Sequence, residues 1–422
     1  MYKKVVLDNG VRVVLERMSS LRSVALGVWA NVGSRYEIKG EEGYSHFIEH
    51  MMFKGTRNRT AAQISNEIDA LGGEMNAFTT HEATAFYVKV LDQQVGAAFD
   101  LLADLFHHSR FGVRDLEKEK QIVIEEIRTV QDDPEDYIHE LHAKDVLGNH
   151  PIGRPILGTP RSMQRMNRRT LLHYKHKFYR PENTIVAVAG NFSFPQLLDQ
   201  INEYFGQWQC EGARNPSETN ASNCWPDKAR TRQSLHHKPL EQVHLCVGFN
   251  GLEVGHPDRY VAYVMNTILG GGVSSRLFQE VREKRGLAYT IYSHLSSFLD
   301  GGTLTVYAAT RPTEVETVIE QICKEARKLC RREVAEKELE RTKTQLKGNL
   351  MLGLEGTYGR MNKLAKDELY QGRHVTLQEI VKAIDRISPD QIRQLSQKLL
   401  DQKEFVVTAL GPIPKKMAAK WG

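Results

Sequence analysis

The sequence has no long hydrophobic run. Its apolar stretches are short, such as TIVAVAG at 184–190, and none approaches the roughly 18 residues that a membrane-spanning helix requires. The first residues also lack the apolar core of a secretory signal and instead predict two strands around a turn at Asp8, Asn9 and Gly10. We therefore expect a protein without a membrane span, located in the cytoplasm.

Cysteine is scarce, and neither sign of charge is in large excess. The five cysteines include no pair with CxxC spacing, which fits a reducing compartment and excludes a disulfide scaffold. The 57 basic residues nearly balance the 52 acidic residues. No long Lys/Arg run with interleaved aromatic residues is present, so a nucleic-acid partner is not expected.

The remaining composition is typical of a globular protein. Apolar residues make up 41% and charged residues 26% of the 422 positions, which is enough apolar material for a sizeable core. A chain of this length exceeds what one hydrophobic core usually organises. The length therefore favours at least two domains.

The chain contains an internal repeat around a polar segment at 210–232. This segment is rich in Asn, Ser, Pro and Gly and has no periodicity, which predicts a linker. On each side the same order of patterns occurs: a strand, a helix, a pair of alternating strands, two amphipathic helices, and a closing helix and strand. We expect an α+β protein with two homologous domains, 1–209 and 233–422, each a mainly antiparallel sheet packed with helices.

The repeated patterns can be placed along the chain. In the first half they lie at 23–37, 46–53, 72–91, 93–108, 114–130 and 167–192. In the second half they lie at 242–258, 260–269, 286–310, 313–329, 335–352 and 388–413.

The first half carries an HxxEH motif on its first predicted helix. His46 and His50 are four residues apart, which places both imidazoles on one helix face where they can bind a single Zn²⁺. Glu49 lies on the same face and is suited to take the proton from an attacking water. Two ordinary half-buried histidines are the alternative, but the pairing with Glu49 favours a hydrolytic metal site with one zinc per chain.

A third ligand must come from elsewhere, and the acidic helix at 117–130 offers four glutamates. Glu119 and Glu126 are seven residues apart on one face, so one can bind the metal while the other supports the site. A purely structural zinc would need a fourth protein ligand, whereas hydrolysis needs a position open to water. Other divalent metals also suit such a donor set.

These motifs resemble those of the inverted-zincin peptidases of the pitrilysin and insulinase family, in which HxxEH is followed at a distance by a glutamate. Here Glu126 follows His50 by 76 residues, and the length and domain order resemble the mitochondrial processing-peptidase branch in bacterial form. The resemblance covers essentially the whole chain. It implies that His46, His50 and Glu126 bind zinc, that Glu49 is the catalytic base and that Glu119 supports catalysis.

The same resemblance implies substrate-binding residues. Asn76 and Ala77 match the family's edge strand, which adds an extended peptide by main-chain hydrogen bonds, although a plain hairpin strand also fits. Arg282 and Tyr289, in the second half, match an arginine and a tyrosine that reach the substrate and stabilise the oxyanion and main chain.

Two further acidic residues have two interpretations. Asp132 and Asp136 fall where processing peptidases carry acidic side chains that favour an arginine near the cleavage point. At a helix start they also suit capping.

The resulting hypothesis is a zinc endopeptidase that cleaves extended peptides or unfolded segments in a chamber between two domains arranged as a clamshell. Relatives of this length pair, so we expect a homodimer, or a heterodimer with a similar subunit. The alternative is a catalytically silent scaffold or partner subunit of the same fold. The intact metal motif argues against that alternative.

Overall fold

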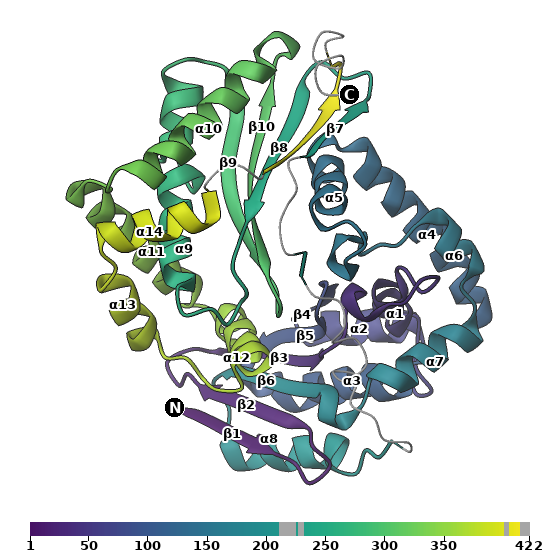
Figure 1. Cartoon of the computed structure of the whole chain (residues 1–422). Coiled ribbons are helices and arrows are strands. Elements are labelled where there is room, and N and C mark those ends of the chain that lie inside the picture. The colour runs from purple at the N-terminus through teal and green to yellow at the C-terminus, as the bar shows by residue number, and fades with distance from the viewer. Residues whose placement is uncertain (211–224, 227–231, 401–404, 414–422) are drawn as a thin grey trace. The chain divides into compact units, whose positions relative to one another are not determined.

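The computed structural model describes residues 1–210, 225–226, 232–400 and 405–413 (Figure 1). Most of the predicted linker at 210–232 therefore lies outside the described residues. The chain forms two compact units. The first comprises the described residues of 1–129, 154–223 and 352–374, and the second comprises those of 130–153, 224–351 and 375–422.

The first unit is built on a six-stranded sheet with the order β1-β2-β6-β3-β5-β4. Its strands are β1 (Tyr2–Val6), β2 (Arg12–Arg17), β3 (Ser23–Ala30), β4 (Glu74–Thr79), β5 (Thr84–Leu91) and β6 (Thr184–Gly190). Only β2 and β6 pair in parallel; the other neighbours are antiparallel. The predicted N-terminal hairpin is confirmed, with Val6 opposite Arg12. β4 is the edge strand that lies beside the HxxEH helix.

Helices of the first half pack on one face of this sheet. They are α1 (Tyr44–Met52), α2 (Ala61–Ala70), α3 (Val95–His108), α4 (Val113–Asp132), α6 (Pro160–Arg165), α7 (Arg168–Phe178) and α8 (Phe194–Ile201). Apolar side chains of α1 and α3, such as Phe47, Phe99 and Phe106, join Phe86 and Val88 of β5 in one buried core. The predicted alternation of β5 thus directs one of its faces toward these helices.

The second unit repeats this plan with five strands in the order β7-β11-β8-β10-β9. These are β7 (Arg232–His237), β8 (Val243–Asn250), β9 (Ala288–Ser297), β10 (Gly302–Thr310) and β11 (Val406–Gly411). Again a single pair, β7 and β11, is parallel. This order matches β2-β6-β3-β5-β4 of the first sheet strand for strand, so the prediction of two α+β domains of one fold is confirmed.

The second unit has its own layer of helices. They are α9 (Arg259–Gly270), α10 (Val315–Arg331), α11 (Glu336–Gly353), α13 (Leu377–Asp385) and α14 (Pro389–Leu400). Short 3-10 or π turns complete both units: η1 (Ser34–Tyr36), η2 (Asp92–Gln94), η3 (Pro151–Gly153), η4 (Pro181–Asn183), η5 (Asn202–Gly206), η7 (Phe278–Glu283) and η8 (Pro312–Glu314). No helix among these described segments is long and apolar enough to cross a membrane.

Each sheet is covered on its second face by a helix from the other half of the chain. The C-terminal half contributes α12 (Thr357–Gln371), which lies across β2, β3 and β6 of the first sheet (Figure 1). Met361 and Leu364 of α12 pack on a surface of small side chains, which includes Ala25, Ala85, Ala187 and Ala189. A Cβ at Gly27 would lie 2.7 Å from Met361 Sδ, so the glycine permits this close approach.

Polar contacts hold α12 at its two ends. Glu368 of α12 is 3% exposed and forms an ion pair with Lys4 at 2.7 Å. Arg360, also of α12, forms an ion pair with Glu16 at 3.1 Å. Arg12 lies 3.6 Å from the other oxygen of Glu368, so two cations compensate this buried carboxylate. These pairs help to fix the position of α12 on the sheet.

The reciprocal contribution is α5 (Pro134–Leu147), which comes from the N-terminal half and packs on β8 and β11 of the second sheet. Ile138 contacts a cluster that includes Cys246 and Tyr307. His142 Nδ1 and Thr408 Oγ1 form a hydrogen bond of 3.0 Å. The His142 ring also contacts Gly248, where an added Cβ would lie 2.3 Å from Nε2. Sequence periodicity contains no signal for this exchange of helices.

Candidate active site and metal centre

The helix that carries HxxEH begins at a buried carboxyl group. Glu37 accepts the backbone N–H groups of Gly43 and Ser45, both at 2.8 Å, and so binds donors that the first turn of α1 leaves free. Burial raises the pKa of Glu37 to about 8, although both backbone bonds act to lower it. Gly43 has φ +88°, and a Cβ there would lie 2.6 Å from the carbonyl oxygen of Leu157. The start of α1 is therefore fixed sterically and electrostatically.

The two histidines share one face of α1, as predicted. The opposite face is held in the core by Phe47, Ile48 and Met51. The rings of His46 and His50 lie 4.5 Å apart between centroids, and His46 is 7% exposed while His50 is half-buried. The apolar face of the helix thus fixes the direction of both imidazoles.

Helix α4 brings Glu126 to this pair. Glu126 Oε1 lies 3.6 Å from His46 Nε2, and Glu126 Oε2 lies 3.6 Å from His50 Nε2. One ligand atom from each residue lies within 4.8 Å of the others, and no second group of this kind occurs in the part of the chain that the structure describes. Two imidazole nitrogens and one carboxylate oxygen form the donor set of a catalytic zinc site, which leaves a fourth position for water.

Glu119 lies behind His50 rather than among the ligands. Its Oε2 is 3.2 Å from His50 Nδ1, and its Oε1 accepts from Lys54 Nζ at 2.8 Å. A proton on Nδ1 directed at Glu119 leaves Nε2 free to bind a metal. The sequence predicted Glu119 as a supporting residue but gave no indication of Lys54, whose ammonium holds the other carboxylate oxygen.

Burial shifts the protonation of the predicted ligands. It lowers the pKa of His46 to about 3, with a smaller contribution from His50, so His46 is neutral at neutral pH. Burial also raises the pKa of Glu126. A divalent cation would favour the ionised form of Glu126, and a neutral His46 can bind one, so the residues present fit a metal such as zinc.

Glu49 faces the edge strand β4. Thr79 Oγ1 donates a hydrogen bond to Glu49 Oε2 at 2.6 Å. Burial raises the pKa of Glu49, and the bond from Thr79 opposes this shift. A carboxyl group with a raised pKa is suited to accept and return a proton near neutral pH. Sequence reasoning missed Thr79, although it ends the strand that carries two predicted substrate residues.

Those two residues, Asn76 and Ala77, lie in the middle of β4. The strand pairs with β5 on one side, and the described residues supply no strand on its other side. Asn76 is exposed, and its Oδ1 accepts the N–H of Ala77 at 2.8 Å. The outer edge of β4 can therefore pair with an extended segment, although at Ala77 such a segment would replace the bond from Asn76.

Arg282 and Tyr289 lie together in the second unit. The guanidinium of Arg282, in η7, is 4.5 Å from the ring of Tyr289 at the start of β9 and 4.9 Å from that of Phe278. Tyr289 is 73% exposed. Arg282 itself is half-buried, and its Nε lies 3.7 Å from Glu283 Oε1. Contact with the aromatic rings leaves the other guanidinium donors able to bind a ligand.

Asp132 and Asp136 lie on either side of a helix boundary. Asp132 is the last residue of α4, and Asp136 belongs to the first turn of α5. The residue that caps α5 is Asp133, whose Oδ1 accepts the N–H groups of Glu135 at 2.8 Å and Asp136 at 3.2 Å. Asp132 ends α4 and does not cap α5, so the capping interpretation is wrong for Asp132. Asp136 lies in the first turn of α5, where an acidic side chain suits the helix N-terminus.

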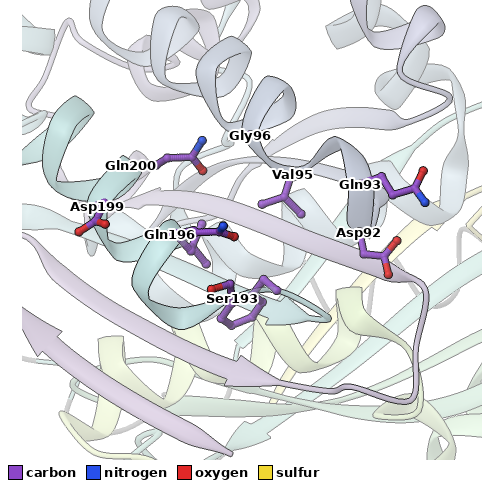
Figure 2. Close-up of a pocket in the computed structure, with 10 residues that line it drawn as sticks. Asp92, Gln93, Val95, Gly96, Ser193, Gln196, Asp199 and Gln200 are labelled. Carbon is purple, nitrogen blue, oxygen red and sulfur yellow. The ribbon is translucent and has the colours of Figure 1, made fainter.

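Two hollows of the first unit do not include the metal-binding group. One, of about 510 Å³, lies between α8 and the segment before α3; Figure 2 shows that its lining is mainly polar, with Gln93, Gln196 and Gln200. The other, of about 590 Å³, is lined by Arg59 and Trp208 among others. Arg59 is already paired with three carboxylates, so this hollow offers little free charge to a ligand.

Comparison with known proteins places these features in a family. A model described as "Insulinase (Peptidase family M16)" matches residues 12–160, and one described as "Peptidase M16 inactive domain" matches residues 165–346. The chain is 41% identical over 412 residues to an uncharacterized zinc protease of Bacillus subtilis, with 98% of each chain covered. It is 37% identical to one of Streptomyces coelicolor, with 99% of this chain and 91% of the relative covered.

Solved structures agree with this assignment at the level of the fold. A protease from Helicobacter pylori superimposes with a TM-score of 0.93 at 22% identity, covering 98% of this chain and 99% of the other. An M16 inactive domain structure from Pseudomonas fluorescens gives a TM-score of 0.90 at 19% identity, with 98% of each chain covered.

Proposed function

Because the chain belongs to the insulinase (M16) family of peptidases, we propose that it is a zinc endopeptidase that cleaves extended peptides or unfolded segments. The observation that carries this proposal is the convergence of His46, His50 and Glu126, with Glu49 on the same helix as the two histidines. Its relatives are zinc proteases by name, and the donor set fits zinc.

In the proposed reaction, the side chains divide the work. A bound Zn²⁺ would supply Lewis acidity and lower the pKa of a water molecule. His46, His50 and Glu126 would hold the metal, while Glu119 keeps His50 in the tautomer that binds through Nε2. Glu49 would take the proton of the attacking water on its carboxylate and return it to the leaving amine.

Substrate binding is proposed for three pairs of residues. The open edge of β4, at Asn76 and Ala77, supports main-chain pairing with an extended peptide, which is why folded proteins would be poor substrates. Arg282 and Tyr289 would stabilise the peptide or its oxyanion. Asp132 and Asp136 would favour a basic residue near the cleaved bond, as in processing peptidases.

The assembly and location remain part of the proposal. We propose a homodimer in the bacterial cytoplasm, with a heterodimer of similar subunits as the alternative. A scaffold without activity is the competing function; the match of residues 165–346 to an inactive domain concerns the half that lacks HxxEH, and so does not favour it.

Cleavage of a quenched fluorescent peptide library tests the proposal. Wild type, Glu49→Gln and chelator-treated protein are compared, with zinc content and mass in solution measured in parallel. We expect wild type to cleave, with a preference for peptides that contain Arg, and Glu49→Gln to bind zinc but lose activity by roughly 10²–10⁴-fold. A zinc-loaded wild type that cleaves no peptide would favour the scaffold function.

A further inference from the structure

The base Glu49 is held by a short chain of hydroxyl groups that ends in the sheet. Thr79 Oγ1 is 2.6 Å from Glu49 Oε2 and 3.5 Å from Thr84 Oγ1. Thr84 Oγ1 in turn donates to the carbonyl oxygen of Val32 at 2.9 Å. Among the described residues, Thr79 supplies the one hydrogen bond that the Glu49 carboxyl group receives.

The number of hydroxyl protons on Thr79 and Thr84 limits which of these hydrogen bonds can exist at the same time. Each threonine hydroxyl has one proton to donate and lone pairs to accept others. The proton of Thr84 is committed to Val32, so toward Thr79 this hydroxyl can only accept. The single proton of Thr79 therefore has two acceptors, Glu49 Oε2 at the shorter distance and Thr84 Oγ1 at the longer one.

The two threonines are fixed by the sheet. They form a directly opposed pair at the end of the β4–β5 ladder, and Thr84 is fully buried. A β-branched side chain on a strand has few rotamers, so the hydroxyl of Thr79 stays within reach of both acceptors. The carboxyl group of Glu49, at the end of a longer and more flexible side chain, has no comparable constraint of its own.

We propose that Thr79 is a positioning residue that fixes the carboxyl group of Glu49. While Glu49 is a carboxylate, Thr79 donates its proton to it and aims it at the reacting water. Thr79 keeps its own proton throughout, so the reaction's proton remains on Glu49 until it passes to the leaving amine.

This inference rests on the proposed function and adds a role for the edge strand. Thr79 lies two residues beyond Ala77, so both side chains are on the same face of β4. The strand that we propose to pair with substrate thus also orients the base. Binding of a peptide at the edge and alignment of Glu49 would therefore both depend on β4.

The test compares Thr79→Val, which keeps the shape and removes the hydroxyl, with Thr79→Ser, which restores it. We expect kcat to fall about 10–100-fold in Thr79→Val, with KM and zinc content unchanged, because a misplaced base costs rate rather than binding. Thr79→Ser should regain kcat to within a few-fold of wild type. Equal kcat in wild type and Thr79→Val, or no recovery in Thr79→Ser, would overturn the inference.

A second comparison asks whether Thr79 acts through Glu49. In a Glu49→Gln background, Thr79→Val should cause no further loss of the residual rate, since the group that it positions is already gone. An undiminished further loss would show that Thr79 acts independently of the base.

Crystal structures of the zinc-loaded wild type and Thr79→Val keep the inference testable even if the protein cleaves nothing. We expect one ordered position of the Glu49 carboxyl group in wild type and a displaced or multiple position in Thr79→Val. An unchanged carboxyl position would refute the positioning role. An inactive wild type with this displacement would contradict the proposed function alone.

Discussion

In the proposed metal site, Glu119 would act on a ligand without binding the metal itself. It is 3% exposed and contacts both His50 and Lys54, so its charge is compensated on one side and directed at the imidazole on the other. Such a carboxylate fixes the ring and makes its second nitrogen a better ligand. Loss of Glu119 should therefore lower the affinity for the metal, and the rate should fall as a consequence.

We therefore predict that Glu119→Gln weakens zinc affinity about 10–100-fold, measured by competition with a chromophoric chelator. Lys54→Met should weaken it less, because Lys54 acts through Glu119. Glu125→Gln on the same helix is the matched control, since Glu125 forms only an exposed pair with Arg128. Equal affinity in Glu119→Gln and Glu125→Gln would exclude the supporting role.

At this scale, spacing in the sequence accounts for part of the site. Helical periodicity placed His46, His50 and Glu49 on one face, and the distance to Glu126 matched a known motif. Thr79 and Lys54 carried no such signal, because their partners Glu49 and Glu119 are brought to them by packing between elements distant in the sequence. The cap of α5 was likewise not identified: it is Asp133, which lies between the two predicted aspartates.

Among the elements, α5 packs on its sheet through an interface that contains several histidines. Four histidines at or near this interface have pKa values lowered by burial: His139, His142, His244 and His294. Burial lowers the pKa to about 3 for His142 and to about 4 for His294. Glu135 and Asp136 on α5 oppose the shift of His139. The helix therefore packs on the sheet with neutral imidazoles.

This arrangement predicts a loss of stability in mild acid. Between the unfolded pKa near 6.5 and about 4, the unfolded chain binds a proton at each of His142 and His294 while the folded chain does not. The free energy of unfolding should then fall as pH decreases through that window, by at most about 1.4 kcal/mol per pH unit for each histidine. Urea unfolding of wild type at several pH values measures this slope.

His294→Gln provides the comparison for that slope. Removal of one titrating group should reduce the pH dependence by the share of one proton. His173→Gln, at an exposed residue of α7, is the control and should leave the slope unchanged. Identical slopes in wild type and His294→Gln would show that this histidine is not linked to folding.

Across the whole molecule, the repeat in the sequence was enough to predict two α+β domains of one fold, because strand alternation and helix periodicity are local properties. The exchange of α5 and α12 was not predictable in this way. Helix α12 has an ordinary amphipathic pattern, whereas the apolar residues of α5 define no clear face. The choice of sheet depends on surface shape, such as the alanine-lined face of β2, β3 and β6 that receives Met361.

The exchange of α5 and α12 predicts that neither half of the chain folds fully without the other. Residues 1–209 made alone should expose the surface that α12 covers, and residues 233–422 should lack α5; each fragment should be aggregated or only partly folded. Co-expression of the two fragments should yield a soluble complex, detected by co-purification through a tag on one of them. Two fragments that are each stable and monodisperse alone would contradict this dependence.

The position of α12 also has a consequence during synthesis on the ribosome. The first sheet is complete in sequence once β6 ends at Gly190, but the helix that covers its outer face ends at Gln371, about 180 residues later. At a translation rate of about 5–20 residues per second, the alanine-lined face stays uncovered for roughly 10–40 s. A nascent chain with an apolar sheet face exposed for that long is a natural client for chaperones that bind at the ribosome exit.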